Sequence, residues 1–182
     1  VDSTGKATCD IFGVTGVRYD YPVHIKNLTI VGDGVTTKYG INVFKSTNVT
    51  LENVTIQNCT ARGLLVNASE VTAIGTLEFS DHGWGNTINV GWGSSATMDR
   101  CSFDAGKATL IGVAGIYVGD DDVANSNGTL EEKFSITPPA GWIKSEQAGA
   151  ALLYIPAAAS VDGTGYGTVE EAIEAVKNTT EP

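Results

Sequence analysis

An eight-residue motif recurs along the chain, and this repeat limits the folds that the sequence can adopt. Residues 23–30 (VHIKNLTI) and 49–56 (VTLENVTI) are apolar at the same positions. The pattern continues at residues 71–73 with 77–79 and again at 96–103, so the copies begin at 23, 49, 71 and 96. Apolar and polar residues alternate within each copy, which is typical of strands. One such unit cannot bury its apolar face alone, so the copies are expected to stack.

Each copy has a hinge and is followed by a further strand. The alternation changes phase at Asn27 and at Asn53, and asparagine tolerates the left-handed backbone that a hinge requires. Short apolar strands recur downstream, at residues 40–43, 63–66, 87–90 and 115–118. No stretch of the first 125 residues keeps a helical period of 3.6. Three strands in about two dozen residues therefore predict one turn of a solenoid.

The N-V-T-I and G-I-x-V motifs, with the asparagine hinge, resemble those of right-handed parallel β-helix proteins of the pectate-lyase-like type. The resemblance covers roughly residues 10–125. It implies an all-β fold, a right-handed parallel β-helix of about five rungs. The strands joined at the hinge would form the second and third sheets. The G-I-x-V strands would form the first sheet, beside which catalytic and sugar-binding groups of that family usually lie.

The repeat also predicts how the chain is organised. Residues 1–128 are expected to form the rungs, and residues 129–160, with Pro138 and Pro139 and an apolar run at 150–155, the closing strands. Residues 161–182 are expected to form an amphipathic helix with Thr168 as its N-cap. That last segment resembles the opening of a β-helix module in bacterial surface proteins, where the helix caps a first rung. We therefore expect a piece of a tandem array whose helix caps a following module.

Charge and hydropathy exclude two classes of partner. Lys and Arg total 11 against 21 Asp and Glu, which gives a net charge of −10 at pH 7. Such a chain opposes a phosphate backbone or an anionic membrane surface, so we expect no nucleic acid partner. No apolar run approaches the roughly 20 residues that span a bilayer, so no membrane insertion is expected. With the resemblance, this predicts an extracellular protein, secreted or attached to the cell wall.

Cysteines and asparagines carry further expectations. Cys9, Cys59 and Cys101 lack the spacing of a metal site. Cys101 falls on an inward position of the repeat and is predicted to be a buried free thiol, whereas a Cys9–Cys59 bridge is left open. Seven N-x-S/T sequons could mark a glycosylated protein, and they lie at Asn27, Asn48, Asn53, Asn58, Asn67, Asn127 and Asn178. The repeat explains several of them better, as residues of its turns.

The outward positions of the first sheet provide the candidate ligand site. Alternation places Asn42, Leu65, Asn89 and Tyr117 in one column, about 4.8 Å apart per rung. The column contains no carboxylate, whereas lyases of the resembled family need clustered acids for calcium and a basic residue, and glycoside hydrolases need paired acids. Flat rings beside amides suit sugar stacking and hydrogen bonds to hydroxyls. The candidate ligand-binding residues are Trp84, Asn89, Trp92, Tyr117 and Asn42. In the alternative interpretation, the Trp rings only pack loops.

Asp81 and His82 are the most enzyme-like pair in the sequence. A histidine beside a carboxylate could serve as base or acid near neutral pH. The alternative is structural, because the polar residues followed by Gly83 resemble the turn that leads each rung into its next strand. A third catalytic partner is not evident, so the turn is the favoured interpretation.

Asp120, Asp121 and Asp122 are the candidate metal ligands. Three carboxylates in one loop could hold calcium together with backbone carbonyls. No EF-hand or nonapeptide spacing accompanies them, so a solvated acidic turn that caps the solenoid is the favoured alternative. No cofactor is expected, and calcium is the one ion that the loop could hold.

Thr50, Thr72 and Thr97 are expected to form an outward column on another sheet. A regular threonine face is found in ice-binding solenoids, but the neighbouring column is charged at Lys26, Glu52 and Asp99. Outward threonines simply suit strands.

The resulting functional hypothesis is a non-catalytic module that serves as a stalk or adhesive unit. Its expected partners are a glycan or polysaccharide, of the host or the cell wall, and adjacent modules of the same chain. Two alternatives stay open: a fragment of a polysaccharide lyase or glycoside hydrolase with the β-helix fold, and a pure structural spacer.

Overall fold

The computed structural model describes residues 10–17, 20–91, 101–119, 134–146 and 152–180. Their strands form two main sheets and a small hairpin. The seven-stranded sheet contains, in spatial order, β1 (Phe12–Thr15), β3 (Tyr39–Phe44), β5 (Arg62–Asn67), β7 (Thr87–Gly91), β9 (Gly115–Val118), β12 (Leu152–Pro156) and β11 (Trp142–Glu146). The five-stranded sheet contains β10 (Phe134–Thr137), β8 (Cys101–Ile111), β6 (Glu70–Ser80), β4 (Val49–Gln57) and β2 (Val23–Val31).

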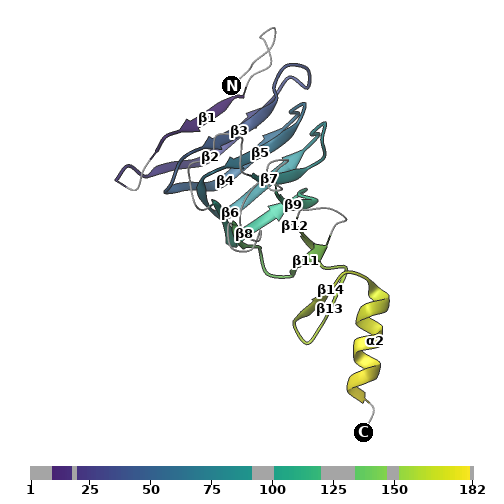
Figure 1. Cartoon of the computed structure of the whole chain (residues 1–182). Coiled ribbons are helices and arrows are strands. Elements are labelled where there is room, and N and C mark those ends of the chain that lie inside the picture. The colour runs from purple at the N-terminus through teal and green to yellow at the C-terminus, as the bar shows by residue number, and fades with distance from the viewer. Residues whose placement is uncertain (1–9, 18–19, 92–100, 120–133, 147–151, 181–182) are drawn as a thin grey trace.

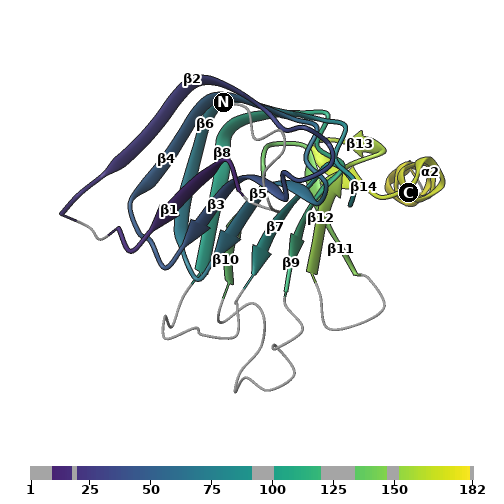
Figure 2. The same ribbon diagram turned by 90° about the horizontal axis from the view of Figure 1, so that it is seen from above.

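Successive strands alternate between the two sheets, so that the chain winds as a coil (Figure 1). In the described part of the chain, β1, β3, β5, β7 and β9 pair in parallel, and so do β2, β4, β6, β8 and β10. Seen from above, the two sheets face each other across the interior (Figure 2). The predicted all-β parallel solenoid is confirmed.

The interior is filled by apolar side chains that stack from rung to rung. In the seven-stranded sheet Ile41, Leu64 and Ile116 are fully buried at matching positions. Opposite them, the five-stranded sheet contributes Phe79 and Phe103. Burying each large side chain contributes about 1.5–3 kcal/mol. The stacked apolar side chains therefore supply the main stabilisation of the fold.

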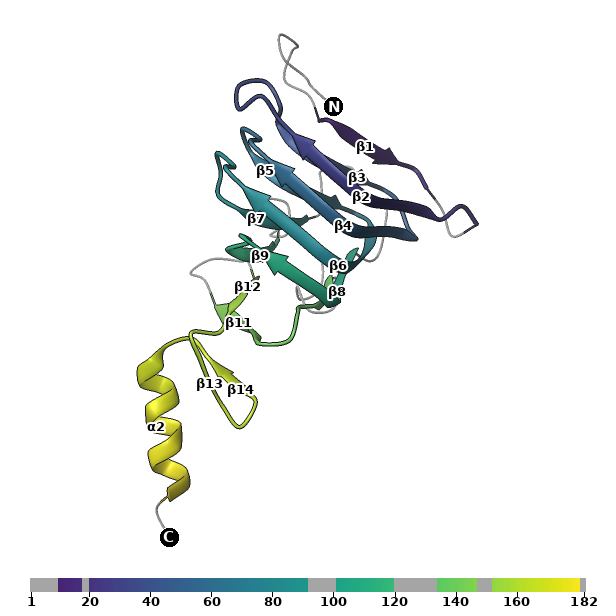
Figure 3. The same ribbon diagram turned by 180° about the vertical axis from the view of Figure 1, so that it is seen from behind.

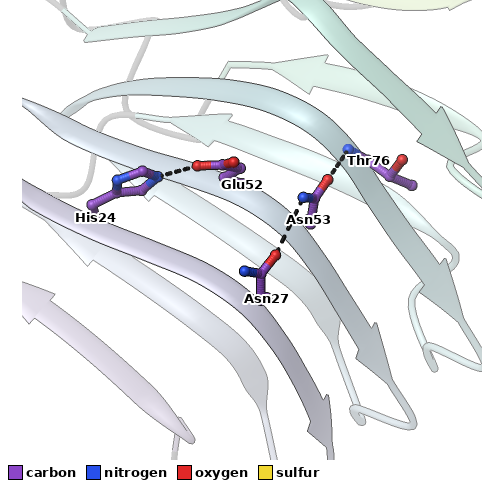
Figure 4. A network of polar contacts seen from close by, with 5 residues as sticks. All are labelled: His24, Asn27, Glu52, Asn53 and Thr76. Carbon is purple, nitrogen blue, oxygen red and sulfur yellow. Dashed lines mark hydrogen bonds and ion pairs between the residues drawn. The ribbon is translucent and has the colours of Figure 1, made fainter.

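The predicted hinges are confirmed at Asn27 and Asn53, whose φ angles are 53° and 52°. Each hinge bends one continuous strand instead of separating two short ones. Asn53 Nδ2 donates to Asn27 Oδ1 at 3.2 Å, and the Thr76 amide donates to Asn53 Oδ1 at 3.1 Å (Figure 4). The third rung has Gly75 at the bend, with φ 66°. Side-chain amides therefore tie the bends of three rungs together.

The fourth copy of the repeat lies in a different register from the one predicted. Val71 pairs with Phe103, and Thr72 pairs with Asp104. The expected partner of Thr72, Thr97, belongs to residues 92–100, which lie outside the described residues, and so does Asp99. The alignment of residues 96–103 with the earlier copies was wrong because the connection from β7 to β8 is longer than the one from β5 to β6. Several apolar positions fit a period of two equally well, so the pattern alone could not fix the register.

The strand pairing of the seven-stranded sheet changes from parallel to antiparallel at β12 and β11. β12 pairs antiparallel with β9, and β11 pairs antiparallel with β12. The hairpin of β13 (Ala159–Val161) and β14 (Thr164–Tyr166) follows, and α2 (Val169–Thr180) packs against it. Figures 1 and 3 show this unit beyond the last rungs, at the end opposite β1. The helix thus lies outside the body of the solenoid.

The helix begins as the sequence predicts. Thr168 Oγ1 accepts a hydrogen bond from the Glu171 amide at 3.1 Å, and Glu171 Oε2 accepts one from the Thr168 amide at 3.2 Å. This reciprocal arrangement is a capping box. Ala172 is buried, whereas Ile173 is 51% exposed. Among the described residues, no helix has both the length and the apolar character needed to cross a membrane.

Two cysteines are buried free thiols. Cys101 is fully buried, as predicted, and burial raises the pKa of its thiol to about 12. Cys59 is also free, and burial raises its pKa to about 11. The Cys9–Cys59 bridge that the sequence left open is therefore not formed; Cys9 itself lies outside the described residues.

Candidate functional site

The outer face of the seven-stranded sheet carries the predicted column. Asn42 pairs with Leu65, Leu65 with Asn89, and Asn89 with Tyr117. All four side chains are half-buried. The order of the column is confirmed, and its role in binding stays a prediction.

Arg62, which the sequence pattern did not reveal, is the first residue of β5 and lies beside this column. Its guanidinium carbon lies 5.5 Å from the centroid of the Tyr117 ring and 6.0 Å from that of the Trp84 ring. Both distances are within the range of cation–π attraction. Arg62 Nη1 also donates a hydrogen bond to Thr87 Oγ1. Three elements, β5, β7 and β9, and the Trp84 turn therefore meet at one cation.

Burial and neighbouring phenols act on this cation in opposite directions. Burial lowers the pKa of the half-buried Arg62 guanidinium, and nearby Tyr39 and Tyr117 counteract that effect. No ion pair joins Arg62 to a carboxylate within the described residues. A guanidinium has five N–H donors. One donates to Thr87, so the others are chemically suited to oxygen atoms of a ligand.

Trp84 gives the face an exposed ring. Its side chain is 60% exposed, although its backbone is anchored by a hydrogen bond from the Trp84 amide to the Ala61 carbonyl at 2.9 Å. An exposed flat ring on a fixed backbone can stack against the apolar face of a sugar. With Arg62 beside it, the ring combines an apolar surface with hydrogen-bond donors.

The structure does not bring every predicted residue to this cluster. Trp84 and Tyr117 meet at Arg62, and Asn89 lies beside Tyr117 in the sheet. Asn42 is two strands from Asn89, and its Nδ2 donates to Asp10 Oδ2 at 2.8 Å. Trp92 lies outside the described residues. We refer to Arg62, Trp84, Asn89 and Tyr117 as the aromatic–arginine cluster.

Asp81 and His82 differ in their exposure to solvent. Asp81 is exposed, with a left-handed φ of 58°, whereas His82 is only 8% exposed. His82 Nδ1 accepts a hydrogen bond from the Cys59 amide at 3.2 Å, and the imidazole meets the Phe79 ring edge-on at 5.6 Å. His82 Nε2 is also buried, and no described residue makes a hydrogen bond of good geometry with it, although the Ile56 backbone lies close enough to influence the imidazole. This geometry supports a structural role in the turn, since a substrate could not reach the buried nitrogen without rearrangement.

The environment of His82 predicts a loss of stability in acid. Burial lowers its pKa below the ordinary 6.5, while hydrogen bonding at the Ile56 backbone and the charge of Asp81 act in the opposite direction. The unfolded chain therefore binds a proton at a higher pH than the folded chain does. The free energy of unfolding should fall as the pH drops below about 6.5 and should be unaffected by this group above it.

Urea unfolding at a series of pH values would test this expectation. The chain has two histidines, so the measurement is best made in a His24→Gln background, which leaves only His82. The further change His82→Gln keeps an acceptor for the Cys59 amide and should flatten the dependence between pH 7 and 5.5. Equal slopes with and without His82 would refute the assignment.

Metal binding has little support in the described part of the chain. Asp120, Asp121 and Asp122 lie outside the described residues, so calcium binding at that loop stays a prediction. Among the residues that the structure describes, no three or more His, Cys, Asp or Glu side chains come together as a metal site would require.

Comparison with known proteins gives one match. The family model described as "Right handed beta helix region" matches residues 12–132. The curated proteins and the solved structures contain no significant match to the chain. The matched range includes every residue of the aromatic–arginine cluster.

Proposed function

Because the chain belongs to the right-handed β-helix family, we propose that it is a non-catalytic module that binds glycan on the outer face of its seven-stranded sheet. The observation that carries this proposal is the placement of Arg62 between the rings of Trp84 and Tyr117. A sugar ring could stack on Trp84 while its oxygens accept hydrogen bonds from Arg62 and Asn89. Because guanidinium groups bind both hydroxyls and carboxylates, neutral and acidic sugars are both candidates.

The composition of the face supports binding over catalysis. The sheet column contains two amides, an aliphatic side chain and a phenol, in the order Asn42, Leu65, Asn89 and Tyr117. Acid–base hydrolysis of a glycosidic bond requires two carboxyl groups on either side of that bond. His82, the other candidate base, is buried beneath the turn.

The shape of the molecule supports a role as a stalk between neighbouring modules. Figures 1 and 3 show β1 and α2 at opposite ends of the coil. The helix leaves Val169, Ile173 and Val176 exposed on one side. An extracellular setting and contact with adjacent modules belong to the same proposal.

A titration of intrinsic tryptophan fluorescence would test the glycan site. The panel should contain acidic and neutral polysaccharides, with and without calcium. We expect a saturable change for at least one polymer, and Trp84→Ala should weaken that binding by about fivefold, because loss of one aromatic stack costs on the order of 1 kcal/mol. Trp84 is exposed, so its removal should leave the fold intact.

Trp142→Phe is the matched control. Trp142 packs partly buried against the core on β11, away from the aromatic–arginine cluster. Its replacement should leave the affinity unchanged. The proposal would be contradicted if no polymer changed the fluorescence, or if Trp84→Ala bound as tightly as the unmodified protein.

A further inference from the structure

A second surface of the molecule has the form of a binding site but a different chemistry. A groove of about 470 Å³ lies on the outer side of the five-stranded sheet, at the start of β4, β6, β8 and β10. Its lining is dominated by hydroxyl, amide and carboxylate side chains. The aromatic–arginine cluster lies on the other sheet, so the two surfaces are separate.

The groove is built from columns of side chains in register. Thr50 pairs with Thr72, Thr72 with Asp104, and Asp104 with Thr137. A neighbouring column includes Glu70, which pairs with Ser102. Adjacent strands lie about 4.8 Å apart, so equivalent polar groups recur at that spacing along the axis of the coil. Ligand groups that repeat at a similar distance could contact one rung after another.

Several residues of the groove lining are held in place by the fold. Val49 and Val71 alternate with the polar positions and are buried in the core, which holds the strands in place. Asp104 Oδ1 accepts a hydrogen bond from the Gly106 amide at 2.9 Å. That bond orients the carboxylate before any ligand arrives, which lowers the entropic cost of binding.

The chemistry of the groove selects among ligands. Carboxylates only accept hydrogen bonds, whereas hydroxyls both donate and accept. The described lining contains Glu70 and Asp104 but no Lys or Arg, so an anionic polymer would be repelled. A ligand rich in hydroxyl groups would supply donors to the Asp104 carboxylate and both donors and acceptors to the threonines and serines.

We propose that this groove binds an uncharged oligosaccharide, an extended β-1,4-linked chain that lies along the coil axis with about one ring per rung. Successive rings of such a chain are turned over relative to one another, but each ring carries hydroxyls on both edges, so every ring can present a hydroxyl to Thr50, Thr72, Asp104 or Thr137, whose strands lie about 4.8 Å apart. The site is additional to the aromatic–arginine cluster and does not depend on it. The module would then hold two glycan segments on different faces.

Isothermal titration calorimetry with cellohexaose tests the site. Thr72 is exposed in the middle of the groove, so Thr72→Trp should fill it and weaken binding by about tenfold or more. The matched control is Thr109→Trp, an exposed threonine of the same sheet outside the groove lining, and it should bind like the unmodified protein. Tryptophan suits strands, so both variants should fold, which circular dichroism would verify.

Two more titrations identify the site that is responsible for binding. One separates binding in this groove from binding at the aromatic–arginine cluster, and the other separates recognition of hydroxyl groups from attraction of a cationic ligand to the acidic side chains. In a Trp84→Ala background, which removes the exposed ring of the aromatic–arginine cluster, cellohexaose should still bind and Thr72→Trp should still weaken that binding by about tenfold, since the groove is on the other sheet. The hexamer of glucosamine, which has the same linkage and carries amines, distinguishes a hydroxyl-binding groove from an acidic patch that attracts cations. The proposal is overturned if cellohexaose gives no binding, if Thr72→Trp binds it normally, if Trp84→Ala abolishes it, or if only the glucosamine hexamer binds.

Discussion

Replacing Phe103 with alanine should lower the free energy of unfolding by about 3–5 kcal/mol, the range for a large ring removed from a packed core. Phe103 is fully buried and lies in register with Val71 on β6 and Ile136 on β10. A cavity there would remove contacts with the rungs on both sides. Neighbouring side chains could collapse into it only by shifting strands that are hydrogen-bonded into the sheet.

Urea unfolding followed by circular dichroism would measure this loss, with Phe44→Ala as the matched control. Phe44 is half-buried at the end of β3, so the same deletion should cost clearly less there. Equal losses at the two positions would mean that Phe103 does not occupy the interior, and the register between β6 and β8 would then be wrong.

Gly112→Ala is expected to be the most damaging change of a single methyl group. Gly112 has a φ of 67°, and a methyl group there would overlap the backbone carbonyl oxygen of Phe79 on the preceding rung. The left-handed backbone costs alanine about 1–2 kcal/mol, and the overlap adds about 1–3 kcal/mol of strain. We therefore expect a loss of about 2–5 kcal/mol in the free energy of unfolding.

Gly85→Ala separates these two contributions. Gly85 has a φ of 85°, but a methyl group there would meet no atom within 4 Å. This variant should show only the conformational cost of about 1–2 kcal/mol. If both variants lost the same stability in thermal or urea unfolding, the close approach of the Gly112 turn to Phe79 would be refuted.

The repeat was sufficient to predict most of the fold because stacked rungs place equivalent residues at equivalent positions. The sequence alone was enough to align Asn42, Leu65, Asn89 and Tyr117, since each lies in a short strand between similar apolar neighbours. The asparagine hinge was predictable for the same reason. The helix could be placed from the Thr168 cap, the acids that follow it and the apolar residues on one face, but the segment expected from residue 161 was too long, because β14 (Thr164–Tyr166) precedes the helix.

The features that escaped prediction depend on connection length and side-chain direction. Asp104 was not recognised as the neighbour of Thr72 because the longer connection from β7 to β8 displaced the fourth copy of the repeat. The polar groove was hidden by that displacement. Arg62 precedes the G-L-L-V strand, and nothing in a strand pattern shows that its guanidinium lies between the rings of Trp84 and Tyr117.

The most direct test of the proposed glycan module is a heteronuclear NMR titration of the uniformly 15N-labelled protein with the tightest-binding oligosaccharide from the polysaccharide panel. We predict that the Trp84 indole signal and the amides of Arg62, Asn89 and Tyr117 shift together and saturate at one concentration, because these residues meet on one face. If the saturating ligand left these signals unchanged, glycan binding by the aromatic–arginine cluster would be contradicted.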